Sequence, residues 1–254
     1  MDKNKIYIAT FSEHAAETAA KYGVNLELND TCISMRLDPE HMDVTLRSME
    51  KELEKAGSRD AIVHGPFTEI IPSAIDHRAV EFGLQRLEEA FEATRAMGLN
   101  RMVVHTGYIP LMYHKSWHLE KSIAFWKRFM EGKPADFQLF IENVFDDEPN
   151  MMADLIDGLE DPRVRMCLDV GHAHVVTVPE YDVYQWIEIL GKRIGHFHLH
   201  NNDGTADTHQ SMDDGTLDMK RVLACIKEHC TDDVTFTIES RKSEENVQWL
   251  LEQE

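Results

Sequence analysis

Histidine and carboxylate side chains recur where short apolar segments of this sequence end. One such segment ends at His64, another at His105, and a third at Glu142, which Asn143 follows. The same residue types stand at or after the ends of later segments, at Asp169, His172, Asp207, His209 and Glu239. Imidazoles and carboxylates, with no serine or cysteine nucleophile beside them, are the ligands that Zn²⁺ or Mn²⁺ sites use. Together they predict a divalent metal site, although any one of them alone is better explained as a hydrogen-bonded residue or a helix cap.

Residues 194–200 carry three histidines on one face. In this segment apolar residues alternate with His196, His198 and His200. Successive side chains of a strand point to opposite sides, so the three imidazoles lie together. We expect the apolar residues to pack against helices and the imidazoles to point inward, where they need polar partners.

The segments that carry these residues are predicted as β-strands, and helices are predicted between them. The expected strands are 5–10, 25–28, 61–64, 101–106, 138–143, 165–170, 194–200 and 234–240. Helical periodicity is found at 42–56, 77–97, 116–130, 181–190, 219–228 and 243–252. Glycines that indicate helix ends stand at 23, 57, 98 and 132.

This regular alternation indicates an α/β fold. We predict that residues 1–254 form one domain, a single (β/α)8 TIM barrel, whose strand ends deliver the metal ligands to one open mouth. A doubly wound open sheet is the alternative, but the Gly-rich phosphate turn of its common nucleotide-binding forms is absent.

The charge balance restricts the partners. The 254 residues include 26 basic and 46 acidic side chains, a net charge of −20. Such a surface repels phosphate backbones and disfavours nucleic acid, while a bound divalent cation would let it hold a small anion. Four cysteines form no CxxC pair, no run is long enough for a membrane helix, and the first residues show no signal-peptide pattern, so a cytoplasmic protein with no membrane contact is expected.

An ordered series of motifs resembles a known superfamily. The series is His64-Gly-Pro-Phe67, Val104-His-Thr-Gly107, Ile141-Glu-Asn143, Cys167-Leu-Asp-Val-Gly-His-Ala173, His198-Leu-His-Asn201, Asp207-Thr-His209 and Ile238-Glu239. It resembles the xylose-isomerase-like barrels, which include sugar isomerases, sugar epimerases and the family 2 apurinic endonucleases (endonuclease IV). The resemblance covers nearly the whole chain, but its motifs do not separate the members of the superfamily.

Carried over by position, four residues look like the single-metal ligands of the epimerase branch: Glu142, Asp169, His198 and Glu239. In that branch the two glutamates also look like the acid–base pair that moves a proton on either side of a metal-held enediolate. The resemblance thus implies a divalent-metal-dependent isomerase or epimerase of a sugar or sugar phosphate, with a small carbohydrate as its partner.

The endonuclease branch, which holds three zinc ions, implies a larger ligand set. His64 and His105 would hold one ion with Glu142, and the four residues above would share the second. The third would use His172, Asp207 and His209. Between one and three ions are therefore expected, Zn²⁺ or Mn²⁺, with Mg²⁺ or Co²⁺ as alternatives.

Three departures weaken the endonuclease interpretation. The Asp-Ser/Thr-Cys-His signature of that branch is Asp169-Val-Gly-His172 here, and the stretch after His198 lacks the branch's lysine. The short loop after Glu27 and the net charge also suit a duplex poorly. A zinc-dependent phosphoester hydrolase is the alternative function, and a third hypothesis is a barrel that binds a metal or ligand without turnover.

Four residues are weaker candidates for substrate binding: Glu27, Asn143, His200 and Arg241. Glu27 could equally be a solvated loop carboxylate, and Asn143 a strand-end turn residue. Arg241 could pair with a substrate phosphate or with a neighbouring acid. Strand geometry places His200 nearer the mouth than His198, whereas the motif favours His198 as the ligand, so His200 is assigned to the surroundings of the metal. Barrels of this kind often form homodimers, but no feature of the sequence marks an interface.

Overall fold

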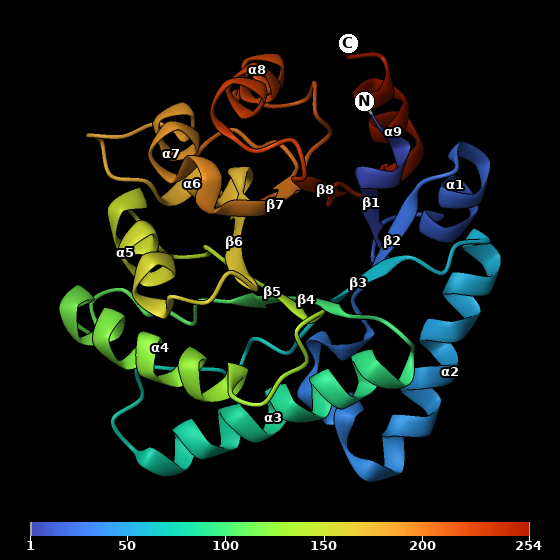
Figure 1. Ribbon diagram of the computed structural model, residues 1–254. Coiled ribbons are helices and arrows are strands. Elements are labelled where there is room, and N and C mark those ends of the chain that lie inside the picture. Colours follow the sequence, from blue (N-terminus) through green and yellow to red (C-terminus); the bar gives the residue numbers. More distant parts are fainter. Residues whose placement is uncertain (1, 254) are drawn as a thin grey trace.

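Eight parallel strands close into a barrel in the computed structural model, which describes residues 2–253 (Figure 1). Each strand pairs with the next along the chain, and β8 returns to β1, which confirms the predicted (β/α)8 TIM barrel. The strands are β1 (Ile6–Ala9), β2 (Asn25–Leu28), β3 (Ala61–His64), β4 (Arg101–His105), β5 (Gln138–Glu142), β6 (Val164–Asp169), β7 (Ile194–Leu199) and β8 (Thr235–Ile238). All eight coincide with predicted strands to within about two residues at either end.

The helices form a ring outside the strands (Figure 1). They are α1 (Ala15–Tyr22), α2 (Pro39–Ala56), α3 (His77–Ala96), α4 (Lys115–Met130), α5 (Pro149–Leu159), α6 (Val170–Val176), α7 (Val183–Leu190), α8 (Met219–His229) and α9 (Ser243–Leu251). Four 3₁₀ turns accompany them, η1 (Lys3–Lys5), η2 (Asp30–Cys32), η3 (Ser34–Leu37) and η4 (Gly191–Arg193). None of the helices within residues 2–253 combines the length and apolarity needed to cross a membrane.

The helix boundaries follow local chemistry. Helix α2 has Pro39 in its first turn, where the missing N–H costs no hydrogen bond, and ends at Gly57, whose φ of 67° is left-handed. Helix α3 begins after Asp76, whose carboxylate accepts from the backbone N–H of Arg78 at 2.9 Å. The four predicted glycine stops all have positive φ, which confirms them.

The structure contains three helices that the sequence pattern did not predict, α1, α5 and α6. Helix α6 is only seven residues long and starts directly after β6, with the Asp169 side chain accepting from the N–H of His172 at 2.6 Å. A helix of two turns gives too little periodicity to be detected in a sequence. It matters here because it turns His172 back over the barrel mouth.

The core has two parts. A large apolar cluster lies between the strands and the helix ring. A separate small cluster occupies part of the barrel interior and consists of Tyr7, Ile62, Val103, Phe140 and Cys167. The small cluster leaves the remainder of the interior to polar side chains from the strands. Those side chains make up the candidate site.

Candidate metal centre

A cavity of about 760 Å³ opens at the carboxyl ends of the strands. Apolar side chains form part of its wall: Phe11, Ile33, Phe67 and Val144. Seven of the nine predicted ligands also line it: His64, His105, Glu142, His172, Asp207, His209 and Glu239. The other two, Asp169 and His198, are fully buried and do not line it.

The first group of potential ligands comes from β3, β4 and β5. The Nε2 atoms of His64 and His105 each lie 3.3 Å from Oε2 of Glu142. Nδ1 of His64 lies 3.0 Å from the carbonyl oxygen of Gly65, which can only accept, so Nδ1 carries a proton and Nε2 is the nitrogen that would offer a lone pair to an ion. Phe67 stacks on the His105 ring at 4.3 Å between centroids and supports it from the cavity side.

The central group surrounds Nδ1 of His198. This atom lies 3.3 Å from Glu142 Oε1, 3.5 Å from Glu239 Oε1 and 3.8 Å from Asp169 Oδ2. It is buried and has no hydrogen-bond partner within residues 2–253. An unpaired polar atom facing three carboxylates is costly in a protein interior unless a cation joins them.

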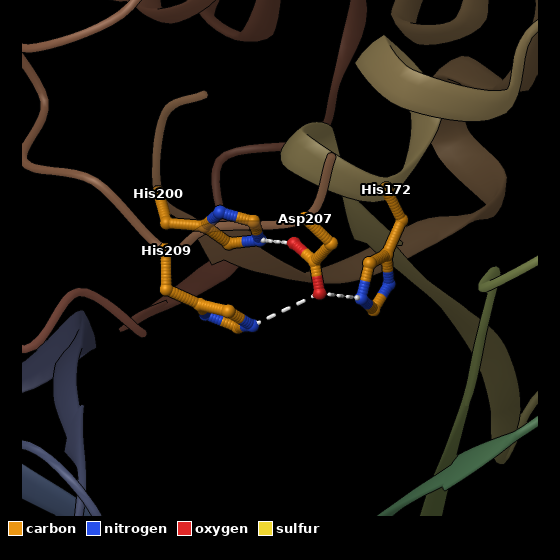
Figure 2. A group of neighbouring side chains, drawn as sticks. All are labelled: His172, His200, Asp207 and His209. Atoms are coloured by element: carbon orange, nitrogen blue, oxygen red, sulfur yellow. Dashed lines mark hydrogen bonds and ion pairs between the residues drawn. The ribbon is translucent and has the colours of Figure 1, made fainter. Parts of the chain in front are cut away.

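The third group gathers around Asp207, as Figure 2 shows. Its Oδ2 lies 3.2 Å from Nε2 of His172 and 3.1 Å from Nε2 of His209, and its Oδ1 lies 3.6 Å from Nε2 of His200. Nδ1 of His172 donates to the Asn143 carbonyl at 2.9 Å. In the same way, Nδ1 of His209 donates to the backbone carbonyl of Glu239 at 2.8 Å. Both rings therefore turn Nε2 toward the carboxylate, and this nitrogen would offer its lone pair to an ion that replaced the proton on it.

These separations fit divalent ions. Ligand atoms held about 2.0–2.1 Å from a tetrahedral Zn²⁺ lie about 3.3 Å from one another. The facing nitrogen–oxygen pairs in the three groups are 3.1–3.8 Å apart. The first two groups share Glu142, through its two oxygens. The backbone carbonyls that fix three of the imidazoles are the outer partners typical of metal-ligating histidines.

The electrostatics of the protein without ions point the same way. Burial opposes a charge on His64, His172 and His198, yet neighbouring groups raise the pKa of each well above its usual value. The leading neighbours are Cys32 and Glu142 for His64, Asp169 and Asp207 for His172, and Cys167 and Glu239 for His198. Asp207 and the surrounding acids similarly raise the pKa of His209, against burial, to about 9. Protons thus take the positions that cations would occupy.

The two candidate acid–base residues differ in their surroundings. Burial works against ionisation of Glu142, but His198 and His105 hold its pKa well below its usual range. Burial raises the pKa of Glu239, and the nearby Glu142 adds to that effect while His198 opposes it.

The four weaker candidates for substrate binding do not line the cavity. Glu27 is fully buried within the barrel, neither solvated nor at the cavity. Asn143 is also fully buried and ties the ends of β5 and β6 together, by bonds to the backbone oxygen and nitrogen of Asp169 at 3.1 and 2.9 Å. His200 is fully buried, and its Nε2 lies 3.0 Å from Asp169 Oδ1.

Arg241 is exposed and does not line the cavity, whereas Arg36 does. Arg36 belongs to η3 and pairs with Asp30 at 3.2 Å. It is the one arginine or lysine among the described residues that line the cavity. No sequence pattern marks Arg36 as a site residue, because it stands in a short 3₁₀ turn and not at a strand end.

Comparison with known proteins agrees with this architecture. The family model described as xylose isomerase-like TIM barrel matches residues 17–253. The chain belongs to that family. In sequence it is 23% identical over 205 residues to the uncharacterized protein MJ1311 of Methanocaldococcus jannaschii, covering 77% of this chain and 69% of that protein.

Two solved structures have folds closely similar to that of this chain. A D-allulose 3-epimerase from Methylomonas sp., in complex with D-allulose, superposes with a TM-score of 0.77 at 14% identity, covering 100% of this chain and 98% of the epimerase. The protein TTHB071 from Thermus thermophilus, soaked with ZnCl₂, superposes with a TM-score of 0.75 at 22% identity, covering 97% and 96% of the two chains. At these identities the likeness shows the shared barrel.

Proposed function

We propose that this member of the xylose isomerase-like family is a divalent-metal-dependent isomerase or epimerase acting on a sugar or sugar phosphate. The observation that carries the proposal is the division of the central group into two layers. Glu142 and Glu239 line the cavity, while Asp169 and His198 lie buried behind them. Two carboxylates thus reach the cavity wall, where a substrate would lie, and both belong to the group that would hold an ion.

The residues divide into ion-holding and proton-moving roles. Glu142, Asp169, His198 and Glu239 would hold the ion, which, when bound, supplies a positive charge for the oxygens of an enediolate. Glu142 and Glu239 stand on different strand ends, so each can hold or release a proton at a substrate carbon. The D-allulose complex of a protein with the same barrel supports a carbohydrate as the substrate class.

The cavity wall suits a small polar molecule with one apolar face. Phe11 and Phe67 lie beside His209 and His105, with ring centroids 5.6 and 4.3 Å apart. Arg36 would neutralise a phosphate if the substrate carries one. The zinc-soaked relative supports Zn²⁺ as one usable ion.

Proton exchange tests this function directly. The protein loaded with Mn²⁺, Co²⁺ or Zn²⁺ and incubated in D₂O with a panel of ketoses and ketose phosphates is expected to place deuterium next to the carbonyl of its substrate. Glu142→Gln and Glu239→Gln should each lower the exchange rate at least about 10²-fold, the contribution typical of a general acid or base. Arg241→Gln, at an exposed position outside the cavity, is the matched control. Absence of exchange with every ketose in any metal form would contradict the proposal.

A zinc-dependent phosphoester hydrolase is the second candidate, because two further groups of ligands flank the central one. Three tightly held zinc ions per chain, with hydrolysis of a model phosphodiester and no deuterium exchange, would favour it. One exchangeable ion with exchange would favour the isomerase. Ligand binding with neither reaction would indicate a barrel that binds without turnover.

A further inference from the structure

Glu27 lies inside the barrel with no exposed surface. It belongs to β2, where its Cα is in register with Ala9 on one side and Ile62 on the other. A buried carboxylate without compensation costs several kcal/mol, so its partners must explain its presence.

Its partners are two histidines and a threonine from β7 and β8. Oε2 of Glu27 accepts from the Thr237 hydroxyl at 2.6 Å and lies 3.2 Å from Nε2 of His196. Nε2 of His198 lies 3.2 Å from each of the two carboxylate oxygens. The Thr237 hydroxyl and the two imidazole nitrogens thus surround both oxygens of the Glu27 side chain, which is the arrangement that a buried carboxylate requires.

The contact fixes which nitrogen of His198 is free. An ionised carboxylate only accepts, so Nε2 of His198 carries a proton. The other nitrogen, Nδ1, is the unpartnered atom that faces Glu142, Asp169 and Glu239. In the neutral ring that atom holds the lone pair which a cation requires.

His196 and its neighbours hold Glu27 in place. Nδ1 of His196 lies 2.6 Å from the Thr235 hydroxyl, and its ring stacks on Phe140 with centroids 5.4 Å apart. Nε2 of the same ring lies 2.8 Å from the Thr237 hydroxyl and 3.2 Å from Glu27 Oε2, so His196 and Thr237 together fix the position of the carboxylate.

We propose that Glu27 is a positioning residue of the metal centre, which fixes the ring orientation and tautomer of His198 and strengthens Nδ1 as a donor to the ion. The substrate-binding role expected for Glu27 from the sequence is replaced by this one. The inference rests on the metal centre of the proposed function, not on the reaction catalysed. Partners of this kind typically contribute 10–100-fold to metal affinity.

A graded series of variants tests the inference. Glu27→Gln keeps an acceptor for the N–H of His198 but loses the charge, and should weaken Zn²⁺ binding about 10-fold. Glu27→Met keeps only the volume, and should weaken it about 100-fold. Thr237→Val removes one donor to Glu27 and one partner of His196 but no contact of His198, and should have an effect of a few-fold. The measurements are the zinc dissociation constant by chelator competition and the d–d absorption of the Co²⁺ form.

Asp146→Asn is the matched control, because Asp146 is also fully buried but bonds to Thr106 and to the backbone N–H of Val144 instead of a histidine. It should leave zinc affinity unchanged. Thermal melts of the metal-free proteins check folding, and the glutamine and valine variants remain informative if the methionine variant does not fold. Equal zinc affinity in folded Glu27→Gln and wild type, with the same Co²⁺ spectrum, would overturn the inference. Failure of deuterium exchange with the graded affinities intact would instead overturn the isomerase function alone.

Discussion

Single backbone oxygens fix the orientation of three imidazoles at the barrel mouth. His64, His172 and His209 each direct Nδ1 at a carbonyl group and Nε2 at a carboxylate. A carbonyl cannot donate, so each ring is held in one orientation, and Nε2 is the nitrogen left to bind an ion. His198 differs from these three, since its outer partner is the Glu27 carboxylate and its inner nitrogen is Nδ1. The chemistry of the site thus depends on groups that are not themselves ligands.

Asp146 provides a prediction about pH that does not involve the ligands. Burial raises its pKa to about 6, and Oδ1 has no hydrogen-bond partner within residues 2–253. The folded protein therefore binds a proton between about pH 4 and pH 6 that the unfolded chain has released, so this group lowers stability as pH rises through that interval. Asp146→Asn should remove the loss, which amounts to about 2–3 kcal/mol at 1.4 kcal/mol per pKa unit.

Denaturant unfolding of the metal-free Asp146→Asn variant and wild type at pH 4, 5, 6 and 7 measures this difference. The quantity to compare is the change in the variant-minus-wild-type free energy of unfolding between pH 4 and pH 7. A difference that does not vary with pH would show that Asp146 is not held protonated by burial.

At the scale of elements, the connection from β6 through α6 to β7 brings the central group, around His198, close to the third group, around Asp207. The β6–β7 register shifts between Met166 and Cys167, so that Asp169 pairs with His198. Helix α6 then starts at once and passes so close to β7 that a Cβ on Gly171 would lie 2.0 Å from Cε1 of His200. Only glycine allows this approach, and it is the approach that places His172 opposite His200 and Asp207.

Gly171→Ala is expected to displace His200, reduce stability by about 1–3 kcal/mol through overpacking, and weaken binding of an ion at the third group. Gly83→Ala is the matched control. It lies within α3, and the added Cβ would make ordinary contact at 3.6 Å with Phe125, so it should leave stability unchanged or raise it by about 0.5–1 kcal/mol. Thermal unfolding and zinc titration distinguish the two. Equal behaviour of both variants would contradict the packing argument.

For the whole molecule, the proposed metal binding would be coupled to the net charge. The chain carries a net charge of −20, and the carboxylates of the site lie in or beside the barrel interior, where their repulsion is poorly screened. Ions that bind only the folded state stabilise it by mass action, by about 4 kcal/mol at a thousand times the dissociation constant.

Removal of metal with a chelator should therefore lower the melting temperature by about 8–16 °C relative to the zinc-saturated protein, since about 1 kcal/mol corresponds to 2–4 °C at this chain length. Differential scanning calorimetry with and without EDTA measures the shift. His198→Ala should show a smaller shift. Identical melting temperatures for chelated and zinc-treated wild type would contradict a metal centre in this barrel.

Much of this arrangement could be read from local pattern. Period-two alternation, helical periodicity and glycine stops are properties of neighbouring residues, and they were sufficient to predict the eight strands and the barrel they form. A parallel barrel has its strand carboxyl ends at one mouth, so residues such as His64, His105 and Glu142 had to lie near one another. The acidic composition and the residue types of the candidate metal ligands can likewise be read directly from the sequence.

The pairing of individual atoms depended on long-range geometry. A one-residue register shift against β6 places His198, and not Phe197, opposite Asp169, and no local pattern encodes that shift. Glu27 stands at a strand end like the ligands, yet barrel closure directs it to the histidines of β7 and β8 and away from the cavity. Arg36 reaches the cavity from an irregular turn. Local sequence specifies which face of a strand a side chain occupies, whereas the partner it meets across the barrel is set only when the sheet closes.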